Sequence, residues 1–138
     1  MPHFIVGIDP GTSKCGLAVL NERGHCLQRV VVSTSQWPAT ITRWAREYTI
    51  SVLVLGDRTG SADFRRQLEA MLTSEPHLAG VGIVMVDEHL SSVQGRRLYL
   101  LERRRGWRRL IPLGLQYPSE PYDDYVAEVL ARRYIDRR

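Results

Sequence analysis

Acidic residues stand at three places where the chain could bring them together. Asp9 ends an apolar run near the N-terminus, and Asp87 and Glu88 end another run in the second half of the chain. Asp123 and Asp124 begin a periodic segment near the C-terminus. Carboxylates that meet repel each other, so hard divalent cations such as Mg²⁺ or Mn²⁺ are their natural partners. Two such ions would activate a water molecule and stabilise the leaving oxygen of a phosphodiester, which makes metal-dependent hydrolysis the candidate chemistry.

Each acid also has a purely structural interpretation. The turn Asp9-Pro10-Gly11-Thr12 could be a plain hairpin with an Asx bond, although phosphate-gripping ATPases of the actin type use a similar Asp-x-Gly-Thr hairpin. Asp87 and Glu88 are adjacent, so at most one of them points into a given site.

The two acids of the last segment differ in their expected surroundings. Asp123 shares a helical stripe with residues 127, 130 and 134, which places it in the first turn of the buried face. A buried carboxylate is unfavourable unless a partner such as a metal compensates it, whereas a helix N-terminus compensates it only a little. Asp124 lies about 100° round the helix with Glu128, and we expect this edge to be more solvated.

Basic residues are concentrated in one segment. Eighteen of the nineteen basic residues are arginine, and Lys14 is the only lysine. Seven arginines and one acid, Glu102, lie between positions 96 and 109, which gives a local charge of +6. Such a segment attracts polyanions, and we expect it to contact RNA or branched DNA, with Trp107 stacking on a base. The alternatives are a solvated helix face and a packed tryptophan. The arginines are Arg96, Arg97, Arg103, Arg104, Arg105, Arg108 and Arg109.

The periodicity of apolar residues predicts the elements that position these groups. Strands are expected over residues 3–8, 15–20, 27–33, 52–55 and 81–86, and helices over 41–48, 61–72, 91–105 and 122–134, with a long loop over 106–121. In the third helix we expect Leu98 and Leu101 to face the core. Short connections make the first three strands antiparallel neighbours, and helical crossovers make the later strands parallel. The prediction is an α/β fold with a five-stranded mixed sheet, helices on both faces and the ribonuclease H-like arrangement, as one domain over residues 1–138.

Length and composition exclude several classes of protein. A chain of 138 residues is too short for a two-lobed actin-type ATPase. Two cysteines do not make a disulfide scaffold, so a reduced, cytoplasmic protein is expected. No apolar run reaches the roughly 18 residues of a membrane span, and the N-terminus does not resemble a signal peptide, so no membrane partner is expected.

Three motifs in order resemble the YqgF (RuvX) proteins, which form part of the RuvC-like branch of the ribonuclease H superfamily. These are Gly-Ile-Asp-Pro-Gly-Thr-Ser-Lys-x-Gly-Leu-Ala-Val at 7–19, Val-Asp-Glu-His-Leu-Ser-Ser at 86–92, and the segment 123–135, which begins Asp-Asp-Tyr-Val-Ala-Glu. The resemblance implies a Mg²⁺- or Mn²⁺-dependent nuclease. By position in the motifs, the metal-binding and catalytic acids fall on Asp9, Glu88 and Asp123, with Asp124 one step away.

The chain departs from the family pattern at two places. His89 stands where the family usually has an arginine, and Gly56-Asp57-Arg58 replaces the Gly-Leu-Pro of many relatives. Because RuvC resolvases carry an acid near the end of that strand as a metal ligand, Asp57 is a candidate fourth ligand as well as a plain loop aspartate. Thr12 and Lys14 are candidates to touch the backbone of the substrate.

The leading hypothesis is an endonuclease that acts on structured nucleic acid. The family is linked to maturation of the 5′ end of the small-subunit ribosomal RNA precursor, which is the favoured role, and also to Holliday-junction cleavage. A resolvase would act as a symmetric dimer on a two-fold substrate, so monomer and homodimer both stay open. The second hypothesis is a nucleic-acid-binding module without catalysis.

Overall fold

A five-stranded mixed sheet forms the centre of the molecule. The computed structural model describes residues 3–57, 61–89, 91–103 and 121–137. The sheet has the order β3-β2-β1-β4-β5; β2 pairs antiparallel with β1 and β3, while β4 runs parallel to β1 and to β5. This confirms the predicted α/β fold and its antiparallel first three strands. The strands are β1 (Phe4–Asp9), β2 (Lys14–Asn21), β3 (Cys26–Ser33), β4 (Ile50–Gly56) and β5 (Gly82–Val86).

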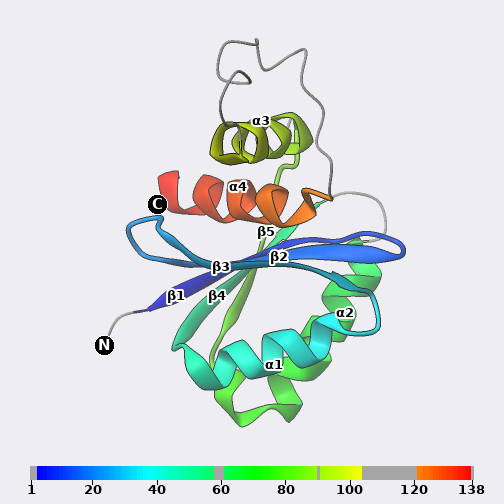
Figure 1. Cartoon of the computed structure of the whole chain (residues 1–138). Helices are drawn as coiled ribbons and strands as arrows, with labels where there is room; N and C mark the ends of the chain where they lie inside the picture. Colours follow the sequence, from blue (N-terminus) through cyan, green and yellow to red (C-terminus); the bar gives the residue numbers. More distant parts are fainter. Residues whose placement is uncertain (1–2, 58–60, 90, 104–120, 138) are drawn as a thin grey trace.

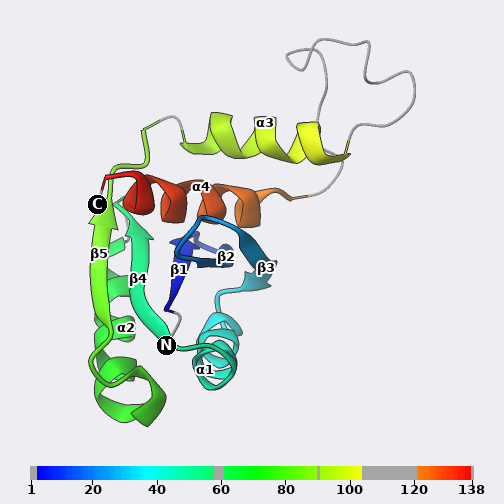
Figure 2. The same ribbon diagram turned by 90° about the vertical axis from the view of Figure 1, so that its left-hand side faces the viewer.

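Helices cover both faces of the sheet, as predicted. Figures 1 and 2 show α1 and α2 on one face and α4 on the other, with α3 as an outer layer on α4. No helix in the described part of the chain is both long and apolar enough to cross a membrane. The helices are α1 (Trp37–Glu47), α2 (Ser61–Ser74), the short 3₁₀ helix η1 (Pro76–Leu78), α3 (Ser91–Arg103) and α4 (Asp123–Asp136).

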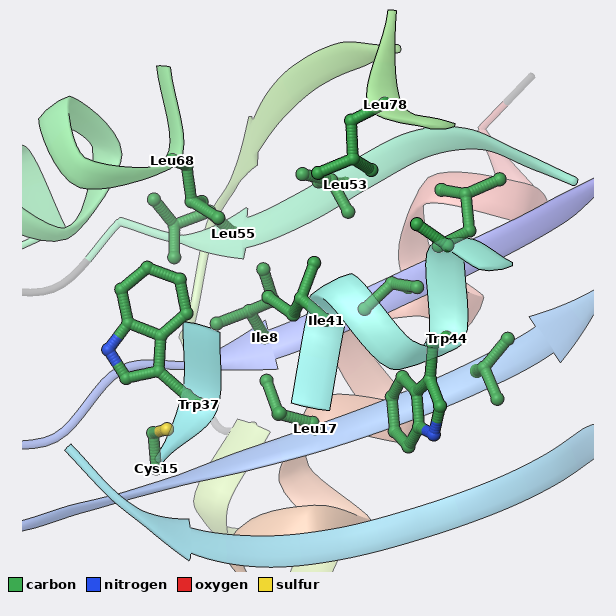
Figure 3. Packing of buried hydrophobic residues seen from close by; sticks show 14 of the residues in the cluster. Ile8, Cys15, Leu17, Trp37, Ile41, Trp44, Leu53, Leu55, Leu68 and Leu78 are labelled. Carbon is green, nitrogen blue, oxygen red and sulfur yellow. The ribbon is translucent and has the colours of Figure 1, made fainter. Parts of the chain in front are cut away.

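The larger core lies between the sheet and the first two helices. Trp37, Ile41 and Trp44 repeat at helical spacing, so α1 presents one apolar stripe to the strands. Figure 3 shows these side chains in one cluster with Ile8 and Leu17 of the strands. Pro38 lies in the first turn of α1, where a missing N–H group does no harm.

Helix α4 is buried on almost every side because it lies between the sheet and α3. Every residue from Tyr125 to Ala131 is buried, so the stripe that we expected from periodicity understates its burial. The expected solvated edge is wrong: Glu128 is 0% exposed, and Asp124 is largely covered. The physical reason is that α3 covers the face of α4 that would otherwise meet water.

Helix α3 packs mainly on α4, and Glu102 near its C-terminal end contacts Arg29 of β3. Its buried residues include Gly95, Tyr99 and Leu100, whereas Leu101 is 39% exposed. The expectation that Leu101 faces the core is therefore wrong. A Cβ atom on Gly95 would lie 2.6 Å from Val126 Cγ2, which shows how closely the two helices approach. The expected helix end at 105 and the predicted loop 106–121 extend beyond the described residues.

Candidate active site

Asp9 ends the central strand β1 between two glycines. Its side chain is only 3% exposed. Gly16 of β2 is its partner in the register of the antiparallel pair. On the other side, Ile8 pairs with Leu55 of β4, so Gly56 is the next residue beside Asp9. Neither neighbouring strand therefore carries a side chain next to this carboxylate.

The space above these glycines is filled by the two other predicted acids. A Cβ on Gly16 would lie 1.9 Å from the carbonyl oxygen of Asp123, because the start of α4 rests on this residue. A Cβ on Gly56 would lie 1.7 Å from Oε1 of Glu88, because the glutamate side chain lies over it.

All three acids stand on the face of the sheet that α4 covers. Ile5 of β1 packs in the α4 core, and a Cβ on Gly7 would lie 2.1 Å from the carbonyl oxygen of Ala127. Alternate residues of a strand share a face, so Asp9 continues this series. Val52 and Val54 place Gly56 on the same face in the same way. The structure thus brings Asp9, Glu88 and Asp123 together around one strand end.

A cavity of about 540 Å³ opens at this strand end. Asp9 and Asp123 both line it, together with the β1–β2 hairpin and the first turns of α2. Glu88 is not among the lining residues, so it stands beside the cavity rather than in its wall. The remaining lining residues are Pro10, Gly11, Thr12, Ser13, Lys14, Thr34, Trp37, Asp63, Phe64 and Gln67.

Asp123 is compensated by a lysine. Its Oδ2 atom is buried and accepts no hydrogen bond from any residue that the structure describes. Lys14 Nζ lies 3.8 Å from this oxygen. We expected from the sequence that Lys14 contacts the substrate backbone, and the structure places it beside Asp123. Its side chain is half exposed, so it can also reach a phosphate.

Asp124 has a different environment from Asp123. Its Oδ2 atom lies 3.9 Å from Arg29 Nε, and its Oδ1 accepts the backbone N–H of Tyr125 at 3.0 Å. Burial raises the pKa of the Asp124 carboxyl above its ordinary value, and Arg29 opposes this effect. Asp124 therefore belongs to the packing between α4, α3 and β3 and does not line the cavity.

Asp57 lies beside Glu88 and fixes its backbone. The Asp57 carboxylate accepts the N–H of Glu88 at 3.2 Å, and its own N–H donates to Val86 O at 3.1 Å. This hydrogen bond gives Asp57 a structural role in its loop, which agrees with its interpretation as a plain loop aspartate.

His89 lies beside a different hollow from the one at Asp9. His89, Asp87, Arg133 and Arg137 line a separate space of about 330 Å³. The N–H of His89 donates to Asp87 Oδ1 at 2.8 Å, which closes a tight turn after β5. His89 therefore does not line the cavity at Asp9.

The predicted nucleic-acid contacts are only partly described. Arg96, Arg97 and Arg103 lie on α3, where Arg97 is exposed and the guanidinium of Arg103 stacks on Tyr99 at 4.7 Å from the ring centre. Arg104, Arg105, Trp107, Arg108 and Arg109 lie outside the described residues.

Sequence reasoning missed four features of this region. Asp63 and Gln67 line the cavity from α2, and Asp63 is ion-paired with Arg66. Arg133 contacts the loop that carries Glu88, and the two glycines make room for the acids. The position of Asp63 in the first turn of a helix could have pointed to it as a candidate. The sequence around Arg133 does not indicate which residues this arginine contacts.

The donor chemistry of the site fits a divalent cation. Three carboxylates supply the oxygen ligands that Mg²⁺ and Mn²⁺ prefer. Gly56 leaves space for the carboxylate of Glu88, and Gly16 leaves space for the backbone of Asp123. In the described ranges, no three side chains of His, Cys, Asp or Glu stand close enough to hold one ion. A shared ion would therefore require these side chains to draw together.

Comparison with known proteins identifies the fold. No protein-family model matches the chain, and no curated protein is similar to it in sequence. Among solved structures, RuvC of Thermus thermophilus matches with a TM-score of 0.55 and 16% identity, over 93% of this chain and 90% of that one. The Fowlpox virus Holliday junction resolvase matches with a TM-score of 0.59 and 10% identity, over 98% and 99%. Its complex with Holliday junction DNA matches with a TM-score of 0.58 and 9% identity, over 97% of both chains. The chain therefore has the ribonuclease H-like fold of RuvC and of the poxvirus resolvase.

Proposed function

We propose that this chain, which has the fold of RuvC and the poxvirus resolvase, is a divalent-metal-dependent endonuclease of structured nucleic acid. The observation that carries the proposal is the convergence of Asp9, Glu88 and Asp123 across Gly16 and Gly56 on one face of the sheet. The three motifs that resemble the YqgF family lie at these same three places. The whole chain, residues 1–138, acts as one domain.

Asp9, Glu88 and Asp123 would hold Mg²⁺ or Mn²⁺, as one ion or two. The metal would lower the pKa of a bound water molecule and stabilise charge on a phosphodiester. Asp9 is buried on the central strand and so supplies a fixed carboxylate, while Asp123 stands at the first turn of α4. Asp57 orients Glu88 through its backbone, and Asp57 and Asp124 are at most auxiliary ligands.

The hairpin after β1 is placed to hold the substrate phosphate. Thr12 and Lys14 line the cavity beside Asp9, and Lys14 supplies a positive charge at 3.8 Å from Asp123. Thr12 offers a hydroxyl donor and Lys14 an ammonium group for the phosphate backbone. The arginines of α3 and of the segment 104–109, with Trp107, extend this contact along RNA or branched DNA.

Maturation of the 5′ end of the small-subunit ribosomal RNA precursor is the favoured role, in the cytoplasm. The motif resemblance supports it. Cleavage of Holliday junctions is the second candidate, and the similarity to a resolvase bound to junction DNA supports that one. The junction role needs a symmetric homodimer, whereas ribosomal RNA processing is compatible with a monomer. Sedimentation of the purified chain therefore helps to separate them.

The test is cleavage of two labelled substrates with Mg²⁺ and with Mn²⁺. A four-way DNA junction and a fragment of the small-subunit ribosomal RNA precursor are incubated with wild type, Asp9→Asn, Glu88→Gln and Asp123→Asn. Asp136→Asn is the matched control, because Asp136 is an exposed acid on the same helix as Asp123.

We expect the wild type and Asp136→Asn to cut the RNA only, and the three site variants to lose at least about 100-fold in rate. Symmetric nicking of the junction would transfer the proposal to the resolvase role. Binding of both substrates without any cleavage would favour the non-catalytic binding module and remove the assigned roles of the acids.

A further inference from the structure

Several hydrogen bonds hold the backbone around Glu88. This residue lies in the short connection that joins the end of β5 at Val86 to the start of α3 at Ser91. The N–H of Glu88 donates to Asp57, and its carbonyl oxygen accepts the N–H of Ser91 at 2.8 Å. These bonds fix the middle of the connection, and they leave the carbonyl groups on either side of Glu88 to be satisfied elsewhere.

Arg133 of α4 satisfies both of these flanking carbonyls. Its Nη1 atom donates to Asp87 O at 2.6 Å, and its Nη2 atom donates to His89 O at 2.6 Å. Nη2 also donates to Oε1 of Gln94 at 2.8 Å, so Arg133 contacts the first turns of α3 as well. One guanidinium thus holds the carbonyl groups of the two residues that flank Glu88.

An arginine suits this contact better than a lysine. The guanidinium is planar and presents its donors in a fixed fork, so two acceptors separated by one residue can be held at once. Bonds from an ionised donor are also stronger than those between neutral groups. A lysine at this position would keep the charge but would lose the fixed fork.

Arg133 and Asp123 stand on the same helix. Ten residues separate them, which is roughly 15 Å along an α-helix. Figure 2 shows that α4 crosses the sheet so that its C-terminal end lies above β5, the strand that leads into Glu88. Through its first turn α4 carries one acid of the site directly, and through Arg133 it holds the backbone of a second.

We propose that Arg133 is a positioning residue that sets the place of Glu88 relative to Asp123, and so tunes the affinity of the site for a divalent cation. This inference rests on the proposed function. Groups outside the immediate ligands orient those ligands, and their loss commonly costs about 10- to 100-fold in metal affinity. Arg133 does not line the cavity at Asp9, and its effect acts through Glu88 alone.

The test measures Mn²⁺ affinity by calorimetry for wild type, Arg133→Gln, Arg133→Lys and Asp9→Asn. Arg137→Gln is the matched control. Arg137 lines the same hollow and carries the same charge, yet makes no hydrogen bond to this connection within the described residues. We expect about 10-fold weaker binding for Arg133→Gln, a smaller loss for Arg133→Lys and no change for the control. Urea unfolding of each variant checks that the folded state persists, and the lysine variant keeps the test valid if the glutamine variant fails to fold.

A double-mutant cycle identifies the route of the effect. If Arg133 acts through Glu88, Arg133→Gln has no further effect on Mn²⁺ binding in a Glu88→Gln background. The same 10-fold loss in both backgrounds would overturn the positioning role, as would wild-type affinity in Arg133→Gln. If Asp9→Asn loses Mn²⁺ while Arg133→Gln binds it normally, only this inference is wrong. If wild type binds no Mn²⁺, the proposed metal site is wrong and the positioning role with it.

Discussion

Gly16 and Gly56 lie on either side of Asp9, and their lack of a side chain leaves room for other groups next to this carboxylate. The atoms nearest to a Cβ at position 16 are backbone atoms of α4, whereas the atoms nearest to a Cβ at position 56 belong to the side chain of Glu88. Backbone atoms of a packed helix cannot move aside cheaply, but a glutamate side chain can change rotamer. The two positions therefore predict opposite outcomes for the same substitution.

Gly56→Ala separates function from stability. Its Cβ would lie 1.7 Å from Glu88 Oε1 and 2.5 Å from Cγ, so Glu88 must swing away from Asp9. We expect metal-dependent cleavage to fall by about 100-fold, because small displacements of a catalytic group carry losses of that size. The urea midpoint should stay close to that of wild type. Full cleavage activity in this variant would contradict the placement of Glu88 in the site.

Gly16→Ala acts mainly on stability. Its Cβ would lie 1.9 Å from Asp123 O and 2.6 Å from Asp124 N, so the start of α4 must shift. Overpacking of this kind costs about 1–3 kcal/mol of unfolding free energy, which urea denaturation measures. Gly82→Ala is the matched control, because nothing lies within 4 Å of a Cβ at this strand position. Equal stability of the two variants would contradict the close contact of α4 with β2.

At the level of the elements, the partly buried Arg29 joins β3 to both helices on the α4 face. Arg29 Nη1 donates to Glu128 Oε1 at 2.8 Å, and Nη2 donates to Glu102 Oε2 of α3 at 3.1 Å. Its guanidinium also stacks on Tyr125, 4.0 Å from the ring centre. These contacts explain how a fully buried Glu128 is tolerated in the middle of α4.

Arg29→Met should leave Glu128 with too little compensation. The Arg29 side chain is 24% exposed and that of Glu128 is 0% exposed, so this pair counts as largely buried. Removing one partner of such a pair costs about 3–5 kcal/mol, and we expect the lower end because Arg132 also reaches Glu128. Urea unfolding measures the loss. Arg43→Met, at an exposed pair with Glu47, should cost less than about 1 kcal/mol. Similar losses for both variants would argue against the buried network.

The same network makes Cys26 a poor nucleophile. Burial, and then the charge of Glu128, raise the pKa of the Cys26 thiol from 9.0 to about 12. Between about pH 9 and pH 12 the folded protein therefore keeps the thiol proton, whereas the unfolded chain loses it. Because the unfolded chain binds fewer protons in this range, the free energy of unfolding falls as the pH rises. Alkylation of Cys26 by iodoacetamide at pH 8.5 should be about 100-fold slower in the folded protein than in the protein unfolded in urea. Equal rates would show that Cys26 is exposed and ionises normally.

At the scale of the whole molecule, sequence periodicity was enough for the sheet. Apolar runs and short connections fix which strands are neighbours, and β1, β2 and β3 follow these rules directly. The relation of α3 to α4 was not predictable in this way. Periodicity shows that a helix has an apolar side, but it does not say whether that side meets a sheet or another helix, and so Leu101 and Glu128 were misplaced.

The positions of the three candidate acids in the fold could be predicted from the sequence, whereas the residues that support them could not. Asp9, Glu88 and Asp123 stand at ends of elements, and the carboxyl ends of neighbouring parallel strands meet at one edge of a sheet. Arg133 lies 45 positions after Glu88 with no local pattern to connect the two, and its contact exists only once α4 has crossed the sheet. Contacts of this kind follow from the assembled fold and not from spacing.

The central claim is that Asp9, Glu88 and Asp123 form one metal site, and anomalous diffraction from crystals of the full chain grown with Mn²⁺ tests it most directly. We expect an anomalous peak at the carboxyl end of β1, with an oxygen of Asp9 and an oxygen of Glu88 or Asp123 at about 2.0–2.3 Å. Asp9→Asn crystals grown in the same way should lose the peak. Ordered carboxylates with no Mn²⁺ between them, or a peak only at some other surface, would show that these three acids do not form a metal site.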